Sequence, residues 1–319
     1  MAVYTEVTDE ALEAFLTEYA IGSIVAFRGI AEGVENSNYS LKTTLGDFIL
    51  TLYEKRVDPA DLPWFLGLME HLARRKITCP QPVRARDGAA LRVLAGRHAA
   101  ITTFLPGVWP RRPRVEHCGP VGAALAGLHL AGVDYRLRRV NALSVHAWLP
   151  LLERCRARAD EVRPNLAAEL DTALTEILAA WPAALPEGHI HADLFPDNVF
   201  FLDEHLSGLI DFYFACTDFL AYDIAICLNA WCFEADFSFN VTKGRAMLRA
   251  YEAIRPLSGQ ERAALPVLCR GAAMRFLLTR LYDWVNTPDG AMVTRKDPVE
   301  YLRRLRFHRW ARDEHAYGL

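Results

Sequence analysis

The chain has 319 residues, of which 52% are hydrophobic and 24% are charged, the composition of an ordinary globular protein with room for two lobes. The 36 basic and 39 acidic side chains give a net charge of −3, which excludes the large basic surface that nucleic-acid binding requires. An acidic, amphipathic N-terminus, the lack of an apolar run of about 18 residues and seven scattered cysteines predict a cytoplasmic protein with reduced thiols that binds no membrane.

The first third of the chain is predicted to be rich in strands, and the segments with strand character are 23–30, 38–45, 48–53, 90–94 and 98–104. Within the second of these segments, Tyr39 and Leu41 are expected to face the same side. A helix is predicted over residues 62–75, because apolar side chains recur there at helical spacing. Together these elements predict a small antiparallel sheet that carries one helix.

A change of composition follows at Leu105-Pro106-Gly107, and two more prolines come soon after it. We place the boundary between two lobes here, so that they span residues 1–105 and 106–319. In the second lobe, helices are predicted over 115–130, 144–160, 166–180 and most of the chain from 222 onward. A hairpin is predicted from 198–202 and 208–212. The expected fold class is therefore α+β, with a small N-terminal sheet lobe and a larger, mostly helical C-terminal lobe.

The clearest chemical pattern is the segment HADLFPDN at residues 191–198, followed by Asp211 after the predicted hairpin. Asp193 is a carboxylate on a loop, which suits a general base that orients a hydroxyl and accepts its proton. Asn198 enters the hairpin and Asp211 leaves it, so the hairpin is expected to bring the two together. Their oxygen atoms are hard ligands of the kind that Mg²⁺ prefers when it neutralises a triphosphate. The pattern therefore predicts magnesium-dependent phosphoryl transfer from ATP.

The order His-x-Asp-x-x-x-x-Asn, with Asp-Phe further on, resembles the catalytic and metal loops of protein kinases. However, Ala192 stands where those kinases have arginine, and DFLAYDIA at residues 218–225 is similar to a segment of the aminoglycoside phosphotransferase and choline kinase superfamily. This resemblance implies a two-lobed, protein-kinase-like fold that uses ATP and Mg²⁺. It also implies that His191, Asp218 and Asp223 brace the loops and do not bind the metal. A polar loop with an unrelated turn is the alternative, and it leaves the combination of these residues unexplained.

The same resemblance implies that the N-terminal lobe binds the nucleotide and that the C-terminal lobe is catalytic and binds the substrate. The loop GVENSNY, residues 33–39, is expected to lie over the phosphates, with contacts from Gly33, Asn36, Ser37 and Asn38. Thr103 and Leu105 are expected at the hinge that meets adenine through backbone groups. Taken alone, the loop is equally compatible with an ordinary hairpin turn.

The phosphate-contacting cation of the superfamily has no clear counterpart, because its position on the third strand holds Thr51. Lys55 is in phase with Thr51 further along the strand and is the candidate, with Lys42 on the preceding strand as an alternative. Both lysines are equally compatible with a solvated surface role. Glu70 lies in the predicted helix, but not clearly at the position of the ion-pairing glutamate.

Over essentially the whole chain the sequence resembles the bacterial homoserine kinases of this superfamily. The stretches that carry the resemblance include GVENSNY, FILTLYEKR, WFLGLMEHLA, HADLFPDNVFF, YDIAICLNAWCFE and RFLLTRLYDW. The resemblance implies L-homoserine as the small-molecule substrate, phosphorylated on its side-chain hydroxyl. Homoserine is a small zwitterion, so its pocket needs groups of both charges, whereas a polycationic aminoglycoside needs a broad acidic cleft.

The candidate substrate-binding residues are Asp193, Glu234, Arg280 and Asp283. Arg280 and Asp283 are three residues apart, so they are expected to share a helix face, where an intrahelical salt bridge is the structural alternative. The aromatic residues between 231 and 239 leave choline open as the acceptor. Aminoglycosides and methylthio sugars are further alternatives, and the missing strand lysine leaves open a non-catalytic, kinase-like binding module.

Overall fold

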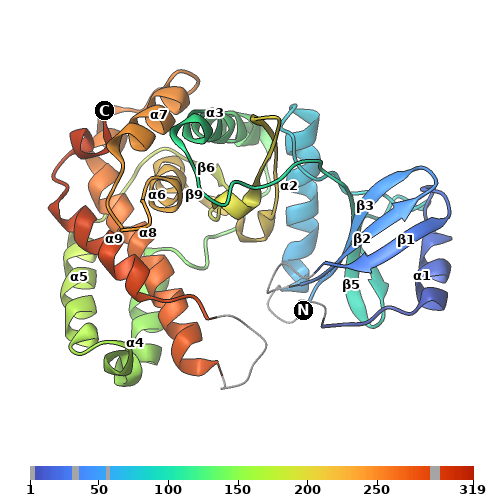
Figure 1. The fold of residues 1–319 in the computed structure, drawn as a ribbon, viewed down its shortest axis with the longest axis horizontal. Helices are drawn as coiled ribbons and strands as arrows, with labels where there is room; N and C mark the ends of the chain where they lie inside the picture. Colours follow the sequence, from blue (N-terminus) through green and yellow to red (C-terminus); the bar gives the residue numbers. More distant parts are fainter. Residues whose placement is uncertain (1–3, 31–35, 55–57, 288–294) are drawn as a thin grey trace. The chain divides into compact units, whose positions relative to one another are not determined.

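The computed structural model describes residues 4–30, 36–54, 58–287 and 295–319 of the chain (Figure 1). The chain divides into two compact units, of which the first comprises Met1–Gly107 and Ser207–Tyr213. The second comprises Val108–Leu206 and Phe214–Leu319. The division after Gly107 lies close to the proline-rich segment, and the sequence pattern did not indicate that Ser207–Tyr213 joins the first unit.

A five-stranded sheet forms the centre of the first unit. Its strands are β1 (Ile24–Gly29), β2 (Ser37–Thr43), β3 (Gly46–Leu52), β4 (Arg92–Leu94) and β5 (Arg97–Thr103). They lie in the order β1-β2-β3-β5-β4, and every neighbouring pair is antiparallel. The turn between β2 and β3 falls at Thr44 and Leu45, two residues earlier than predicted, since Thr43 pairs with Gly46. Tyr39 and Leu41 are both buried, as their alternation predicts.

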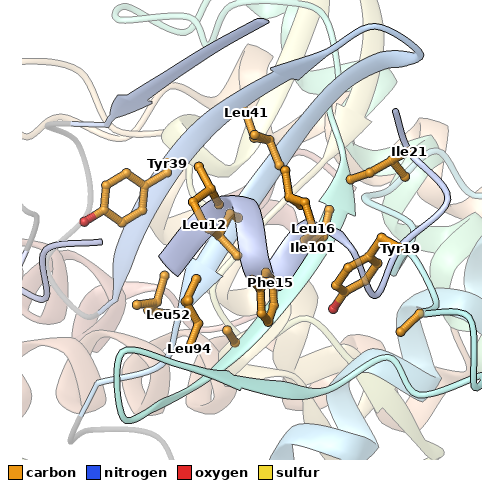
Figure 2. Close-up of a cluster of buried hydrophobic side chains, with 13 residues drawn as sticks. Leu12, Phe15, Leu16, Tyr19, Ile21, Tyr39, Leu41, Leu52, Leu94 and Ile101 are labelled. Carbon is orange, nitrogen blue, oxygen red and sulfur yellow. The ribbon is translucent and has the colours of Figure 1, made fainter. Parts of the chain in front are cut away.

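Two helices accompany this sheet, one more than predicted. Helix α1 (Asp9–Leu16) begins at Thr8, whose side chain accepts a hydrogen bond from the Ala11 N–H. Figure 2 shows how Leu12, Phe15 and Leu16 extend from α1 into the core of the sheet. Burying each of these side chains stabilises the unit by about 1.5–3 kcal/mol. Helix α2 (Leu62–Arg74) lies on the opposite side of the sheet from α1 (Figure 1).

The second unit is mostly helical, as predicted. Its helices are α3 (Val115–Ala131), α4 (Val145–Val162), α5 (Leu166–Ala180), α6 (Leu220–Trp231), α7 (Val241–Glu252), α8 (Gly259–Asn286) and α9 (Val299–Trp310). Helix α8 is held at its start by reciprocal hydrogen bonds between Ser258 and Glu261, and it packs against α4, α6 and α9. The short 3-10 turns of the chain are Pro59–Asp61, Gly132–Asp134, Pro196–Asn198, Phe212–Phe214 and Glu314–Tyr317. Within the described ranges, no helix combines the length and apolar character needed to cross a bilayer.

Two pairs of short strands frame the HADLFPDN segment. Strands β6 (Glu187–Ile190) and β9 (Cys216–Phe219) pair in antiparallel fashion, and the sequence analysis predicted neither of them. Strands β7 (Val199–Leu202) and β8 (His205–Leu209) form the expected hairpin. The prediction of 208–212 for its second strand was wrong, because β8 ends before Asp211, whose φ of 62° is incompatible with a continuing strand.

Candidate active site

The segment 191–198 forms a loop between β6 and the hairpin, and Asp223 on α6 holds its beginning. The Asp223 carboxylate accepts hydrogen bonds from the N–H groups of His191 and Ala192, at 2.7 and 2.9 Å. It also lies 3.2 Å from Nε2 of His129, whose other ring nitrogen is 2.7 Å from the Tyr251 hydroxyl. Burial raises the pKa of Asp223, but these hydrogen bonds and the nearby histidines outweigh it and hold the pKa below its usual value. The loop is therefore anchored on a buried, ionised carboxylate.

Ala192 has the strained backbone of the loop, with a φ of 63°. A residue with a Cβ atom adopts this left-handed conformation at a cost of about 1–2 kcal/mol. Asp223 binds the N–H of Ala192, and Arg275 on α8 donates from Nη1 to its carbonyl oxygen at 2.5 Å. The N–H and the carbonyl of Ala192 are thus both held by hydrogen bonds, which fixes the direction of the backbone as it enters Asp193.

Asp193 and Asn198 lie at opposite ends of a tight turn and contact each other. The Asn198 amide nitrogen donates to the Asp193 carbonyl at 2.7 Å and to its carboxylate Oδ2 at 3.2 Å. With the amide nitrogen used in this way, the Asn198 Oδ1 atom has no hydrogen bond among the described residues. The Asp193 N–H donates to Nδ1 of the fully buried His191 at 3.3 Å, so the histidine supports the loop from inside.

Asp218 and Trp231 tie the surroundings of this loop together. The Asp218 carboxylate accepts hydrogen bonds from Asn141 Nδ2 at 2.7 Å and from the Ser144 hydroxyl at 3.0 Å, which joins β9 to the start of α4. The indole N–H of Trp231 donates to the Leu194 carbonyl at 2.8 Å. Asp218 and Trp231 thus serve the packing of the loop and its neighbours.

Asp211 belongs to the first unit and follows β8 directly. It is exposed and has a left-handed φ of 62°, a strained conformation for a residue other than glycine. The Tyr53 and Tyr213 hydroxyls meet nearby at 2.9 Å. Burial raises the pKa of Tyr213 to about 12, and the Asp211 charge adds to this effect.

Two of the predicted nucleotide-binding residues, Gly33 and Lys55, lie outside the described residues. The prediction for Ser37 needs correction, because its buried hydroxyl is already fully used. It accepts from the N–H groups of Tyr4 and Thr5, at 2.8 and 3.1 Å, and donates to Glu54 at 2.7 Å. A hydroxyl has one donor and two acceptor positions, so none remains for a phosphate. Ser37 instead fastens the N-terminal segment to the sheet.

The neighbouring asparagines bind the adjacent strands through their side chains. Asn36 Oδ1 accepts from the Glu54 N–H at 3.3 Å, and Asn38 Oδ1 accepts from the Thr51 hydroxyl at 2.8 Å. Thr51, at the position where the resemblance implies a lysine or arginine, thus makes a neutral hydrogen bond. The alternative candidate Lys42 is exposed and lies 4.0 Å from Asp47 near the turn between β2 and β3, a surface position.

Three further residues named in the sequence analysis lie in the first unit: Glu70, Thr103 and Leu105. Glu70 pairs with Arg84 at 2.6 Å, so its ion-pair partner is an arginine of the loop before β4. At the predicted hinge, the Thr103 N–H donates to the Gln81 carbonyl at 2.9 Å. Neither backbone group of Leu105 makes a hydrogen bond within the described part of the chain.

The intrahelical salt bridge between Arg280 and Asp283, the structural alternative in the sequence analysis, does not form. The Arg280 guanidinium instead bonds the Glu300 carboxylate on α9 at 2.7 Å and the Asp297 carbonyl at 3.2 Å. The two arginine bonds arise because α9 packs along α8 (Figure 1), a contact that the spacing within one helix does not reveal. Asp283 lies near Cys155 of α4, whose pKa rises by burial and, to a smaller extent, through the Asp283 charge.

Glu234 is also engaged within the protein, with Lys243 Nζ at 2.7 Å and the Asn240 amide at 2.7 Å. The aromatic residues proposed as a choline box pack among themselves. Phe233 lies 5.2 Å from Phe239, and Phe239 stacks on Phe307 at 4.9 Å between ring centroids. Phe233, Phe239 and Phe307 are partly buried and pack against one another, which weakens the sequence argument for choline.

Sequence reasoning missed the residues of α8 and α9 that surround the 191–198 loop. Arg275 was given no role, although it binds the loop directly. Tyr301 and Arg304 were not considered at all. The available signal was the segment YLRRLRF, where an arginine follows a tyrosine by one helical turn, but arginines on an apparent surface helix are ordinarily solvated.

Known sequences resemble this chain over most or all of its length. The model of a family described as "Phosphotransferase enzyme family" matches residues 26–257. The homoserine kinases of Acidiphilium cryptum (strain JF-5) and Granulibacter bethesdensis are 73% and 72% identical over 319 residues, covering 100% of each chain. The homoserine kinase of Rhodospirillum rubrum is 65% identical over 319 residues, which cover 100% of this chain and 99% of its own.

Solved structures confirm the predicted α+β, protein-kinase-like fold class. An amicoumacin kinase, solved with AMP-PNP, Ca²⁺ and its substrate, matches with a TM-score of 0.70 at 14% identity, covering 96% of this chain and 95% of its own. A choline kinase from Cryptosporidium parvum Iowa II matches with a TM-score of 0.68 at 13% identity, covering 94% of each chain. At such identities the likeness concerns the fold, whereas the full-length sequence matches define the family. The chain therefore belongs to the phosphotransferase enzyme family and, within it, to the homoserine kinases.

Proposed function

We propose that this protein transfers the γ-phosphoryl group of ATP to the side-chain hydroxyl of L-homoserine, giving O-phospho-L-homoserine for threonine biosynthesis in the cytoplasm. The observation that carries the acceptor assignment is the full-length identity with proteins named homoserine kinase. The chemistry is supported by the 191–198 loop, which presents a carboxylate on a strained and doubly anchored backbone. Anchoring of this kind preorganises a catalytic group before the substrate arrives.

Asp193 is the proposed general base. Its carboxylate orients the acceptor hydroxyl and takes the proton as the oxygen bonds to phosphorus, while ADP leaves with the electrons of the broken P–O bond. The Asn198 amide donates a hydrogen bond to Asp193 Oδ2, which helps to orient the carboxylate. His191, Asp218 and Asp223 are proposed to support this arrangement without contacting the substrate.

Asn198 and Asp211 are the proposed ligands of Mg²⁺. An amide oxygen and a carboxylate are hard donors, which suit a magnesium ion that completes its shell with phosphates and water. No cluster of three or more histidine, cysteine, aspartate or glutamate side chains occurs in the described ranges, and such clusters are typical of tighter, all-protein metal sites. When bound, the metal supplies charge neutralisation for the triphosphate.

The first unit is the proposed nucleotide-binding lobe, and the second the catalytic and substrate-binding lobe. The Leu105 backbone groups are proposed to bind adenine, with Thr103 beside them. Gly33, Asn36, Asn38 and Lys55 remain proposed phosphate contacts, whereas Ser37 does not. In this proposal the lobe that contains the sheet binds ATP, and the helices around the 191–198 loop bind the acceptor.

A panel of acceptors tests the proposal. The purified protein is assayed for ADP formation with L-homoserine, choline, ethanolamine and kanamycin, each with and without Mg²⁺. We expect kcat/KM for L-homoserine to exceed that of each other acceptor by at least about 100-fold, because an acceptor that lacks one of the matched charges leaves a buried partner group unpaired. A higher kcat/KM for choline or kanamycin would refute the acceptor assignment and leave the kinase chemistry intact.

A further inference from the structure

Two arginines, Arg280 of α8 and Arg304 of α9, lie around the side chain of Tyr301, and a third, Arg275 of α8, lies over Phe276 and bonds the 191–198 loop. The Arg280 and Arg304 guanidiniums lie 4.6 and 4.4 Å from the centroid of the Tyr301 ring, within cation–π distance. Tyr301 itself is fully buried and packs against Phe276, at 5.3 Å between centroids. Tyr301 is thus a rigid support that fixes the position of two cations.

This cluster is connected to the proposed base. Phe276 packs against Phe195 of the 191–198 loop at 4.9 Å between centroids. Burial is the main reason why the pKa of Tyr301 is raised, and the Asp193 charge raises it further, so the tyrosine lies within electrostatic reach of Asp193. The Arg304 guanidinium also donates to the Asn229 carbonyl at 2.8 Å, on the helix whose Trp231 binds Leu194. Arg304 therefore belongs to the surroundings of the acceptor.

The three cations differ in how their charge is balanced. Arg280 has a carboxylate partner, since it bonds Glu300 at 2.7 Å. Arg275 has none in the described part of the chain, but it is 2% exposed and donates to the Ala192 carbonyl, so it is enclosed beneath the loop. Arg304 is half-buried, has no carboxylate within ion-pair distance among the described residues, and its Nε atom has no hydrogen-bond partner.

A guanidinium in the position of Arg304 is suited to bind an anion. Partial burial removes water from the charge, and only a carbonyl and two aromatic rings replace it, Tyr301 at 4.4 Å and Phe233 at 5.4 Å. An incoming carboxylate supplies the missing charge and offers two oxygens to the planar fork of N–H groups. Because the ring of Tyr301 fixes the guanidinium, little side-chain freedom is lost on binding.

We propose that Arg304 binds the α-carboxylate of the amino-acid acceptor, with Tyr301 as its support. This inference rests on the proposed function and deepens it, because it explains how an amino acid is selected over an amino alcohol. Arg304 holds the carboxylate end of the substrate, and the hydroxyl at the other end reaches Asp193. Arg280, which is paired with Glu300, helps to hold the Tyr301 ring and does not bind the substrate carboxylate.

The test compares ligands that differ by one charged group. 3-Aminopropan-1-ol is L-homoserine without its carboxylate, and 4-hydroxybutyrate is homoserine without its ammonium group. We expect Arg304→Met to lower kcat/KM for L-homoserine by about 100-fold and to raise the inhibition constant of 4-hydroxybutyrate by a similar factor. The inhibition constant of 3-aminopropan-1-ol is expected to change by less than about threefold, because this ligand has no carboxylate to lose.

Two variants serve as controls. Arg303→Met removes the adjacent arginine of α9, which is exposed over Phe237, and it is expected to leave all three ligands unchanged. Arg304→Lys keeps the charge without the bidentate fork, and it is expected to raise KM for L-homoserine with little change in kcat. Binding of 3-aminopropan-1-ol reports that each variant is folded.

The inference is overturned if Arg304→Met weakens 3-aminopropan-1-ol as much as 4-hydroxybutyrate, because the arginine would then act on the fold. It is also overturned if the variant raises KM for ATP and leaves that for L-homoserine unchanged, because the arginine would then contact a phosphate. The proposed function itself fails in a different way, through a wild-type protein that does not phosphorylate L-homoserine.

Discussion

Ala192 in the 191–198 loop and Asp211 in the first unit both have a strained backbone, with φ values of 63° and 62°. Such conformations persist where the surroundings over-determine them, and they gather at functional sites. At Ala192 the determinants are the Asp223 carboxylate on the N–H and the Arg275 guanidinium on the carbonyl. The strain is therefore offset by two charged hydrogen-bond partners, and the residue that it directs is Asp193.

Replacement of the Asp193 carboxylate by an amide tests its role as the base. We expect Asp193→Asn to lower kcat for L-homoserine by roughly 10²–10⁴-fold, because the amide keeps the shape of the side chain but accepts no proton. The dissociation constant of ATP, measured by calorimetry, is expected to stay near its wild-type value. Asp197→Asn is the matched control, since Asp197 is an exposed carboxylate of the same loop. Retention of wild-type kcat in Asp193→Asn would exclude this residue as the base.

The part of the site that is local in sequence was predictable. Asp193 and Asn198 are five residues apart, so one pattern of eight letters contains both. The proposed Arg304 site was not predictable, because Arg304 is over a hundred residues away in the sequence. It comes near the loop only through the packing of α9 on α8. Ser37 was misassigned for a related reason: the segment that uses its hydroxyl, Tyr4 and Thr5, has no sequence feature that indicates this contact.

At the scale of whole elements, the crossing of α3 and α7 depends on one glycine. A Cβ atom placed on Gly122 would lie 2.1 Å from the Met247 carbonyl oxygen, a backbone atom that has no flexible side chain to move away. Gly119 is one turn earlier on α3, and a Cβ atom there would lie 4.0 Å from the Ala246 carbonyl oxygen, which is an ordinary contact. Substitution by alanine is therefore expected to change the stability differently at the two glycines.

Gly122→Ala is expected to lower the free energy of unfolding by about 2–4 kcal/mol, because α3 and α7 must separate to admit the methyl group. Gly119→Ala is expected to be neutral or to add up to about 1 kcal/mol, through the better helix propensity of alanine. Urea unfolding of both variants measures the difference. Equal stabilities would show that the two helices adjust at little cost.

Element predictions succeeded where the hydrophobic period is long. Helix α5 was predicted over the range that the structure shows, since 15 residues contain several helical turns of apolar repeats. Strands β6 and β9 were missed because each has four residues, too few to show a period, and they include polar side chains such as His189 and Asp218. Tertiary pairing, which the local sequence does not encode, decides these short strands.

At the scale of the whole molecule, a buried histidine makes the free energy of unfolding depend on pH. His308 is fully buried between the Tyr317 hydroxyl at 3.0 Å and the Asn229 amide oxygen at 3.1 Å. Burial, together with the charges of Arg304 and Arg270, lowers the pKa of His308 to about 3. The unfolded chain binds a proton near pH 6.5 and the folded one does not, so the stability from this group is present above that pH and is lost as the pH falls towards 3.

Between pH 6.5 and 4 this histidine is expected to remove about 2–4 kcal/mol from the free energy of unfolding. His308→Gln keeps a polar side chain of similar size without a titrating group. It is expected to be less stable at pH 7 but to lose less stability on acidification, as urea unfolding at a series of pH values will show. Parallel pH profiles for wild type and variant would mean that His308 makes no contribution to acid sensitivity.

The central claim is that this chain phosphorylates the hydroxyl of L-homoserine, and the most direct measurement is identification of the product by ³¹P NMR. L-Homoserine, ATP and Mg²⁺ are incubated with the protein, and the phosphorus signals are correlated with protons. We expect one new phosphomonoester signal, coupled to the methylene protons next to the side-chain oxygen and equal in amount to the ADP formed. Release of inorganic phosphate without this ester, or no turnover of L-homoserine under conditions where another acceptor is phosphorylated, would contradict the account.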